Sequence, residues 1–356
     1  MDLSGALHRK NVHLQTEAVR LADSLKLPML LQFPDGSMSA LAFFRNGIPM
    51  YRITHNAAGA ALINSHQVYP GGGAGLSLSG SGQTLGIWDG GKVRNTHVEL
   101  TGRVTQKDGA PTLSDHSTHV AGTMIASGVS STAKGMSYAA SLHAYDWDND
   151  ASEMASAAAT DNIRVSQHSY GFVTGWHYGN WSGTYAWHWF GDINISPAED
   201  YNFGFYEETA SDWDQIAWDA PHYLIVKSAG NDRNDGPSPG TSHYYYDGIW
   251  LPSTAIRDKD GGTDGYDCIP SNGNAKNILT IGAVDVSGNM SSFSGWGPTD
   301  DGRIKPDVVA KGVSVYSSGS GTDNTYVSKN GTSMSGPMVS GSRSEEHTSE
   351  LQSRIT

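Results

Sequence analysis

From residue 83 onward, the chain alternates short apolar runs with small-residue segments of helical length. This alternation is typical of βα units, in which parallel strands form one sheet and helices pack on its faces. It predicts an α/β fold, and polar residues at the strand ends mark the edge of the sheet where ligands bind in such folds. The predicted strands are QTLGIWD (83–89), SLHAYDW (141–147), RVSQHSYG (164–171), LIVKSAGN (224–231) and NILTIGAV (277–284), and the predicted helices are HVAGTMIASG (119–128) and residues 151–162.

Residues 1–66 have a different pattern. Apolar residues at helical spacing predict one amphipathic helix, at Leu14, Ala18, Leu21 and Leu25. The dipeptide Asp35-Gly36 lies between two strand-like runs, as in a β-hairpin. We expect a short helix within residues 56–66 and a flexible joint at the glycine-rich residues 71–75. A domain boundary near residues 66–76 would separate a small α+β segment (1–66) from the main unit (67–342).

The composition excludes several classes of protein. The formal net charge is −13 and no basic stripe is present, so we expect no nucleic-acid partner. No run approaches the length of about 18 apolar residues that a transmembrane helix requires, so we expect no membrane partner. Cys268 is the single cysteine, which excludes an internal disulfide, and residues 1–13 carry no signal-peptide pattern. Stability must then come from packing or from bound ions.

Three segments carry the residue types that acyl transfer requires. The segment GIWDGG contains Asp89, DHSTHVAGT contains His116 and His119, and NGTSMSGP contains Ser333. A hydroxyl nucleophile needs a nitrogen base to take its proton and a carboxylate to orient that base. Each residue alone has an ordinary explanation, as a turn residue, a core histidine or a helix N-cap. Their joint occurrence favours a hydrolase.

These segments resemble the signatures of the subtilisin-like serine peptidases, the subtilase superfamily: D-x-G, H-x-T-H-V-A-G-T and G-T-S-M-x-x-P. The chain order Asp, His, Ser is also that of subtilisin. Two further blocks agree, FSGWGPTDDGRIKPDVVAKG (293–312) and VKSAGND (226–232). The resemblance covers about residues 76–342. It implies a three-layer fold with a mostly parallel central sheet flanked by helices, and it is strongest to the large secreted bacterial subgroup.

The resemblance implies a serine endopeptidase that hydrolyses peptide bonds through an acyl-enzyme and needs no cofactor for catalysis. It assigns the orienting carboxylate to Asp89, the general base to His116, the nucleophile to Ser333 and the oxyanion-hole amide to Asn231; His119 is then a packing residue. An extended substrate would pair as an added strand with Ser169, Tyr170 and Gly171. Ala229 and Gly230 would complete the wall of the specificity pocket. We expect the protein to be a monomer whose partners are polypeptide substrates. We expect it to be located outside a bacterium or on the surface of the cell.

Two further features have more than one interpretation. Asp146, Asp148 and Asp150 form either a solvated or capping turn, a Ca²⁺ site or a determinant for basic substrate residues, and the missing glycine excludes an EF-hand. Because relatives commonly carry Ca²⁺, we expect structural Ca²⁺ without assigning its ligands. Residues 172–222 are either a large surface loop pinned by its own aromatic cluster or a wall of the substrate cleft. They hold six of the ten tryptophans: 176, 181, 187, 189, 213 and 218.

Other functions remain open on the sequence. A sedolisin-like acid peptidase shares the serine block but uses Glu in place of His, which His116 disfavours. A non-catalytic relative that binds glycans or proteins through the aromatic insert is the second alternative. An α/β-hydrolase esterase is excluded by motif, because the serine block lacks the second glycine of G-x-S-x-G.

The end of the chain departs from this pattern. RSEEHTSELQS (343–353) matches the translation of a common sequencing-adapter oligonucleotide, so we interpret residues 343–356 as an artefactual tail. Charged residues there cannot form a buried helix, because unpaired buried carboxylates are costly. The biological chain is expected to continue past Ser342 with another sequence.

We therefore predict that the chain, expressed as written, is insoluble or inactive. Loss of a core helix removes several buried side chains worth about 1.5–3 kcal/mol each, comparable with a total stability of about 5–15 kcal/mol. The measurements are the solubility of the expressed 356-residue chain and its rate of casein hydrolysis. A folded protein with normal turnover would contradict our interpretation of the tail.

Overall fold

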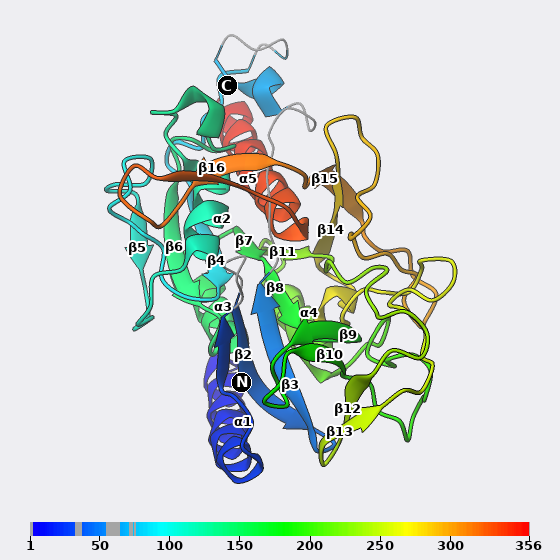
Figure 1. The fold of residues 1–356 in the computed structure, drawn as a ribbon. Helices are drawn as coiled ribbons and strands as arrows, with labels where there is room; N and C mark the ends of the chain where they lie inside the picture. The colour runs from blue at the N-terminus through cyan, green and yellow to red at the C-terminus, as the bar shows by residue number, and fades with distance from the viewer. Residues whose placement is uncertain (1–2, 33–37, 55–64, 71–73, 75, 356) are drawn as a thin grey trace.

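The computed structural model describes residues 3–32, 38–54, 65–70, 74 and 76–355 (Figure 1). Its central strands are β4 (Thr84–Asp89), β5 (Val104–Gln106), β6 (Ser141–Asp146), β7 (Val165–His168), β11 (Leu224–Ser228), β14 (Leu279–Val284) and β15 (Val308–Lys311). They form one seven-stranded sheet in the order β15-β14-β11-β7-β4-β6-β5. All of its pairings are parallel. The predicted α/β fold with a mostly parallel sheet is confirmed.

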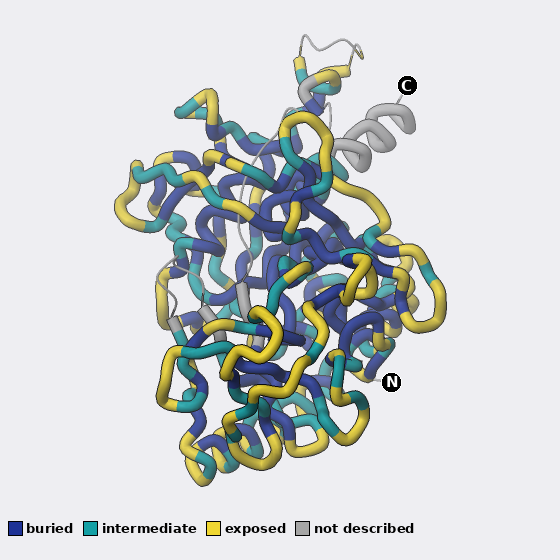
Figure 2. Tube along the Cα trace, turned by 45° about the vertical axis from the view of Figure 1, so that its right-hand side comes forward, coloured by how far each residue is buried: buried dark blue, intermediate teal, exposed yellow. Residues whose placement is uncertain are grey.

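Helices cover both faces of this sheet, which gives three layers. The helices are α2 (Asp115–Ile125), α3 (Asp150–Thr160), α4 (Glu208–Asp219) and α5 (Thr332–Ile355). Successive side chains of β4 point to opposite faces of the sheet and therefore contact different helices. Leu85 and Ile87 belong to the hydrophobic cluster that includes α2 and α5, whereas Trp88 belongs to the cluster that includes α3 and α4. Figure 2 shows the buried residues at the centre and the exposed ones on peripheral loops.

The first part of the chain forms a helix and a second, antiparallel sheet. It contains α1 (Leu3–Leu25), β1 (Leu30–Gln32), β2 (Met38–Arg45) and β3 (Ile48–Thr54). The predicted helix and hairpin are therefore present, although the Asp35-Gly36 turn, the joint at 71–73 and 75, and most of the helix expected within 56–66 lie outside the described residues. A 3₁₀ turn, η1, spans Ser65–Val68.

This second sheet recruits a strand from the main unit. The predicted strand 164–171 was wrong as a single strand, because β7 ends at His168 and β8 (Tyr170–Phe172) leaves the central sheet. The order of the second sheet is β1-β2-β3-β8, and β8 pairs antiparallel with β3. The chain changes sheets at Ser169 because β3 supplies the pairing that β8 needs.

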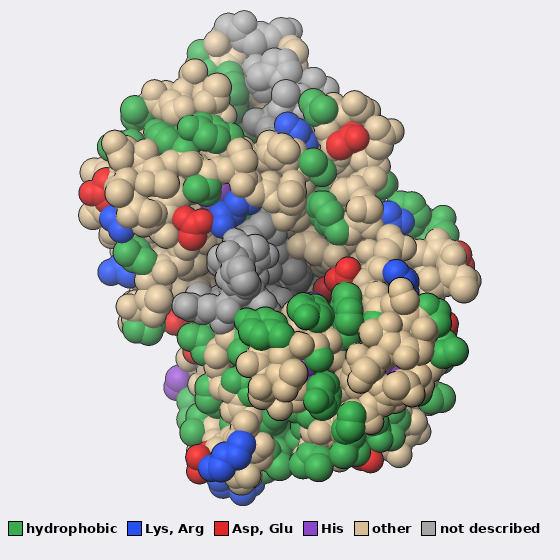
Figure 3. All heavy atoms as spheres, in the orientation of Figure 1, with side chains coloured by type: hydrophobic (Ala, Val, Ile, Leu, Met, Phe, Trp, Pro, Cys, Tyr) green, Lys and Arg blue, Asp and Glu red, His purple; other side chains and the backbone are tan. Residues whose placement is uncertain are grey.

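Residues 172–222 are not a large surface loop, so that interpretation was wrong. They contribute β9 (Trp176–Gly179), β10 (Ala186–Trp189) and α4. With β12 (His243–Asp247) and β13 (Ile249–Ser253), they form a sheet in the order β13-β12-β10-β9. Four of the six tryptophans in this segment act as core residues, because those at 176, 181, 189 and 213 are at most 2% exposed, whereas Trp218 is 76% exposed. In Figure 3, many hydrophobic side chains lie on the lower half of the molecule, where Figure 1 places the N-terminal sheet and strands β9, β10, β12 and β13.

The last elements lead into the serine block. A hairpin of β16 (Val315–Ser318) and β17 (Tyr326–Lys329) precedes α5. The predicted helix after the serine is present, and its backbone continues to Ile355. Ser344 is buried, and the side chains beyond it lie outside the described part. Two further 3₁₀ turns are η2 (Ser131–Ala133) and η3 (Ser271–Asn274). No helix of the described residues is both long and apolar enough to cross a bilayer.

Candidate active site

Asp89 and His116 form a buried polar pair at the carboxyl edge of the central sheet. Asp89 is the last residue of β4 and His116 lies in the first turn of α2. Nδ1 of His116 lies 2.6 Å from Oδ1 of Asp89, and the side chains are each 1% exposed. The same oxygen accepts the Ser117 hydroxyl at 3.0 Å and the Gly90 N–H at 2.7 Å. An ionised carboxylate can only accept, so Nδ1 carries the proton and Nε2 is the basic nitrogen.

Local sequence explains why His116 faces Asp89. Ser114 caps α2, and its hydroxyl oxygen accepts the Ser117 N–H at 3.0 Å. This cap satisfies one of the otherwise unpaired N–H groups of the first turn. The helix consequently begins at Asp115 and presents His116 to the end of β4.

Ser333 lies at the start of α5, directly after Thr332, where that helix begins. Gly331 has a φ of +144°, a conformation that favours glycine before the helix. The Ser333 hydroxyl donates to the Ser169 carbonyl at 2.8 Å, and the Ser169 hydroxyl donates to the Ser333 carbonyl at 2.8 Å. The structure therefore ties Ser333 to the predicted substrate segment through both of these hydrogen bonds.

Asn231 is held against the same helix start. Its Oδ1 accepts the N–H of Thr332 at 2.8 Å and the Thr332 hydroxyl at 3.0 Å. With Oδ1 engaged in this way, the Nδ2 donors are directed away from the Thr332 N–H. Gly230 precedes Asn231 with a φ of +96°, and a Cβ there would approach Pro270 to 2.8 Å. Ala229 follows β11, so both predicted wall residues lie in the loop that carries Asn231.

The predicted substrate segment already has a strand beside it. Thr54 pairs with Tyr170 and Ile53 with Gly171 in the antiparallel register of β3 and β8. The Tyr170 hydroxyl donates to Oδ2 of Asp150 at 2.8 Å and lies 3.0 Å from Nδ1 of His168. The edge that was expected to receive a substrate thus pairs with the N-terminal segment.

The comparisons with known proteins identify the family of the chain. The model of the subtilase family matches residues 53–344, which is more than half of the chain. The chain belongs to the subtilase family. Subtilases are serine peptidases, so the coarse class predicted from the sequence is confirmed.

Individual relatives match over shorter stretches. The chain is 38% identical over 97 residues to C5a peptidase of Streptococcus pyogenes, in an alignment that covers 26% of this chain and 8% of that protein. It is 45% identical over 64 residues to subtilisin DY of Bacillus licheniformis, which covers 18% and 20% of the two chains. Aligned regions thus span a fifth or less of these two relatives. The prenylagaramide maturation protease PagA is similar in fold, with a TM-score of 0.50, 16% identity and coverage of 76% and 77%.

Asp146, Asp148 and Asp150 do not gather around one point in this subtilase. Oδ1 of Asp146 accepts the Asp148 N–H at 2.8 Å, whereas Oδ2 of Asp150 accepts the Tyr170 hydroxyl. Across the described residues, no three His, Cys, Asp or Glu side chains are arranged to hold a metal ion. Structural Ca²⁺ stays a prediction without assigned ligands.

His119 supports the neighbouring hairpin. Its Nε2 lies 3.0 Å from the Val315 carbonyl and 3.2 Å from the Val327 carbonyl, one on each strand. Because both partners only accept, Nε2 carries the proton. Burial, together with the charge of Lys329, lowers the pKa of His119 to about 3. His119 is therefore a neutral donor that joins α2 to β16 and β17.

Sequence reasoning missed the polar network around Glu99. Glu99 accepts the N–H groups of residues 128, 129 and 130 and the hydroxyls of Ser127 and Tyr326. Burial alone would raise the pKa of Glu99, but these hydrogen bonds outweigh it and the pKa is lowered. Its partners come from distant segments, and a single glutamate before a leucine carries no local signal of that role.

A histidine kept neutral by burial makes stability depend on pH. The unfolded chain binds a proton at His119 near pH 6.5, whereas the folded chain does so only near pH 3. The stability contributed by neutral His119 is therefore present above about pH 6.5 and falls as the pH drops toward 3. We predict that the stability advantage of the wild type over His119→Gln shrinks over this range, as measured by urea unfolding. Exposed His222→Gln is the control, and a pH-independent advantage of the wild type would contradict the assignment.

Proposed function

We propose that this subtilase is a serine endopeptidase in which Ser333 is the nucleophile, His116 the general base, Asp89 the orienting carboxylate and Asn231 an oxyanion donor. The observation that carries the proposal is the 2.6 Å contact between Asp89 and His116 at the edge of the sheet. That contact fixes the tautomer in which Nε2 can accept a proton. Asn231, held against the first turn of α5 beside Ser333, supports the same proposal.

The proposed acylation step follows from these positions. Rotation of the Ser333 side chain away from the Ser169 carbonyl would turn its hydroxyl toward His116. Oγ then bonds to the substrate carbonyl carbon while its proton passes to Nε2 of His116. The oxyanion accepts hydrogen bonds from Nδ2 of Asn231 and the Ser333 N–H at the positive end of the α5 dipole. The C–N bond breaks as His116 returns the proton to the leaving amine.

Hydrolysis of the acyl-enzyme completes the cycle. A water molecule gives its proton to His116 and attacks the ester carbon, and the proton then returns to Oγ of Ser333. Substrates would be polypeptides bound as an extended strand on Ser169, Tyr170 and Gly171, with Ala229 and Gly230 beside the side chain before the scissile bond. The antiparallel pairing of β3 on β8 supports this mode, because it demonstrates that this edge accepts a strand.

We predict that a fluorophosphonate labels the protein covalently and that Ser333→Ala abolishes the labelling. Asn231→Leu should lower kcat by about 10²–10³-fold, the loss known for the corresponding donor of subtilisin. Labelling is measured by mass spectrometry on soluble protein, from a reading frame extended past Ser342 if the chain as written does not fold. Ser335→Ala is the control, since this hydroxyl bonds the Thr332 carbonyl. Persistent labelling of Ser333→Ala would refute the nucleophile.

We also propose that residues 1–66 inhibit the enzyme in cis as a prodomain remnant; an integral extension is the alternative. The end of β3 occupies β8, where the substrate would pair. The segment is anchored by an ion pair between Arg45 and Glu207, whose side chain is 4% exposed, and by one between Lys10 and Asp212. Apolar side chains add to the anchor, because Tyr51 shares a cluster with Trp181 and Phe190 of the insert.

Weakening the β3–β8 pairing should release this inhibition. Ile53→Pro removes a ladder donor, and a loss of one or two hydrogen bonds worth about 0.5–1.5 kcal/mol each predicts labelling faster by ~10-fold. Leu30→Pro, on the outer strand β1, is the control. Unchanged labelling of Ile53→Pro would favour an integral extension, and mass spectrometry of the mature N-terminus gives an independent answer.

The alternative functions have less support. A sedolisin-like acid peptidase requires a glutamate at the position where His116 contacts Asp89. An activity maximum near pH 3–4 would support this alternative. A glycan-binding protein would be indicated by retention on glycans without hydrolysis of casein. We propose an extracellular or cell-surface location in a bacterium and a monomeric state, as the resemblance implies.

A further inference from the structure

Asp115 and Lys329 connect the helix that carries His116 to the hairpin that leads into Ser333. Nζ of Lys329 lies 2.7 Å from Oδ2 of Asp115, and the Lys329 side chain is only 8% exposed. Asp115 is the first residue of α2, directly before His116, and Lys329 is the last residue of β17. The Asp115 side chain is 32% exposed, so the pair is partly buried and is screened less by salt than a fully exposed pair.

The second oxygen of the same carboxylate contacts the loop that joins the two strands of the hairpin. Oδ1 of Asp115 accepts the N–H of Ser320 at 2.6 Å, just after β16 ends. Burial alone would raise the pKa of Asp115, but the hydrogen bonds from Lys329 and Ser320 outweigh it and the pKa is lowered. The carboxylate therefore stays ionised and contacts both the end of β17, at Lys329, and the loop that follows β16, at Ser320.

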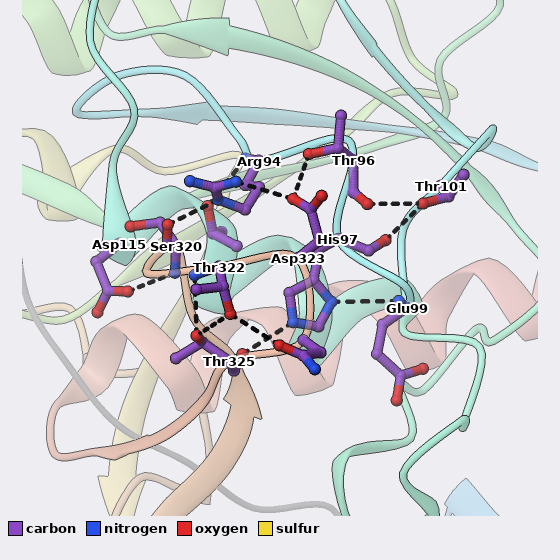
Figure 4. Close-up of polar contacts among 12 residues, drawn as sticks. Arg94, Thr96, His97, Glu99, Thr101, Asp115, Ser320, Thr322, Asp323 and Thr325 are labelled. Atoms are coloured by element: carbon purple, nitrogen blue, oxygen red, sulfur yellow. Dashed lines mark hydrogen bonds and ion pairs between the residues drawn. The ribbon is translucent and has the colours of Figure 1, made fainter.

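The tip of the hairpin is tied to the segment that follows Asp89 (Figure 4). Arg94 Nη1 lies 2.8 Å from Oδ1 of Asp323, which also accepts the Thr96 hydroxyl at 2.6 Å. The Val98 N–H donates to the Asp323 carbonyl at 2.7 Å. The hairpin is thus held at its tip by the Asp89 segment and at its base by the start of α2.

From these contacts we infer that Asp115 and Lys329 are positioning residues that set Ser333 in register with His116. The inference rests on the proposed function. Three residues, 330–332, separate Lys329 from Ser333, so displacement of Lys329 displaces the start of α5. Neither side chain is assigned a contact with substrate or reacting atoms. Their effect is on the rate of proton transfer and acylation, because misplacement of a reacting group by about 1 Å can cost ~10²-fold in rate.

The test separates positioning from stability by comparing two ion pairs, each between a nearly buried lysine and a partly exposed aspartate. Lys329→Met should lower the rate constant of fluorophosphonate acylation by about tenfold and leave its binding constant within about twofold. Lys329→Arg should restore much of the rate. Lys305→Met is the matched control, because Lys305 also pairs with an aspartate, Asp307, at 2.7 Å. The side chains of Lys305 and Asp307 are 3% and 31% exposed, and those of Lys329 and Asp115 are 8% and 32% exposed. Unchanged acylation in folded Lys329→Met, or an equal loss in Lys305→Met, would overturn the inference.

A double-mutant cycle tests whether the two residues act as a unit. Asp115→Asn combined with Lys329→Met should lose little more acylation rate than either single variant, because one removal already opens the pair. Additive losses would contradict a shared role.

Hydrogen exchange provides a readout that does not need the proposed chemistry. Amides of residues 326–333 should exchange faster in Lys329→Met than in Lys305→Met. If folded wild type, produced from the reading frame extended past Ser342, is not labelled at all, the proposed function fails, and exchange alone then decides the inference. Equal exchange in the two variants would overturn it.

Discussion

A buried carboxylate at the end of β4 dictates much of the architecture around the site. Removing an ionised carboxylate from water is costly unless donors replace the lost solvent. Asp89 meets this requirement at Oδ1, which accepts from His116, Ser117 and Gly90, whereas Oδ2 has no hydrogen-bond donor among the described residues. Two of these donors belong to the first turn of α2, so the cap at Ser114 and the start of that helix are tied to the same charge. The orientation of His116 is a consequence of satisfying Asp89.

The parallel sheet explains why residues distant in sequence meet at one edge. All seven strands run in the same direction, so their carboxyl ends lie along the same edge. Asp89, Ser169 and Ala229 each end or follow one of these strands. The start of α5 reaches this edge through the bonds of Ser333 to Ser169 and of Thr332 to Asn231. The hairpin before α5 is in turn held by His119 and Asp115.

The N-terminal segment and the insert form a second apolar core. Tyr51 of β3 lies edge-on to Trp181 and to Phe190, with ring centroids 6.3 Å apart in each case. Aromatic pairs of this geometry stabilise beyond their buried area by about 0.5–1.5 kcal/mol. Because β3 also pairs with β8, this core connects the N-terminal segment to the strand where a substrate would bind. The insert, residues 172–222, therefore forms part of the core that holds the N-terminal segment in place.

Much of the main unit could be predicted from local patterns. The strand that ends at Asp89 and the helix at Ser333 are in the structure as expected, whereas β11 ends at Ser228 instead of residue 231 and α2 begins at Asp115 instead of residue 119. The insert could not be predicted in the same way, because Trp181 packs with Tyr51 of the N-terminal segment and Trp176 packs against His243, contacts that join segments far apart in the chain. The division of residues 164–171 between two sheets escaped the sequence for a similar reason, since the partner that draws β8 away is β3.

The sequence by itself determined the family, the α/β class and the residue types at the candidate site, because short motifs and hydrophobic periodicity are local properties. Tertiary structure alone decided which groups touch. It directed the Ser333 hydroxyl to Ser169, gave Glu99 its five donors, and paired Asp115 with Lys329. Such contacts join segments far apart in the chain, and their geometry depends on how whole layers pack, which no local pattern encodes.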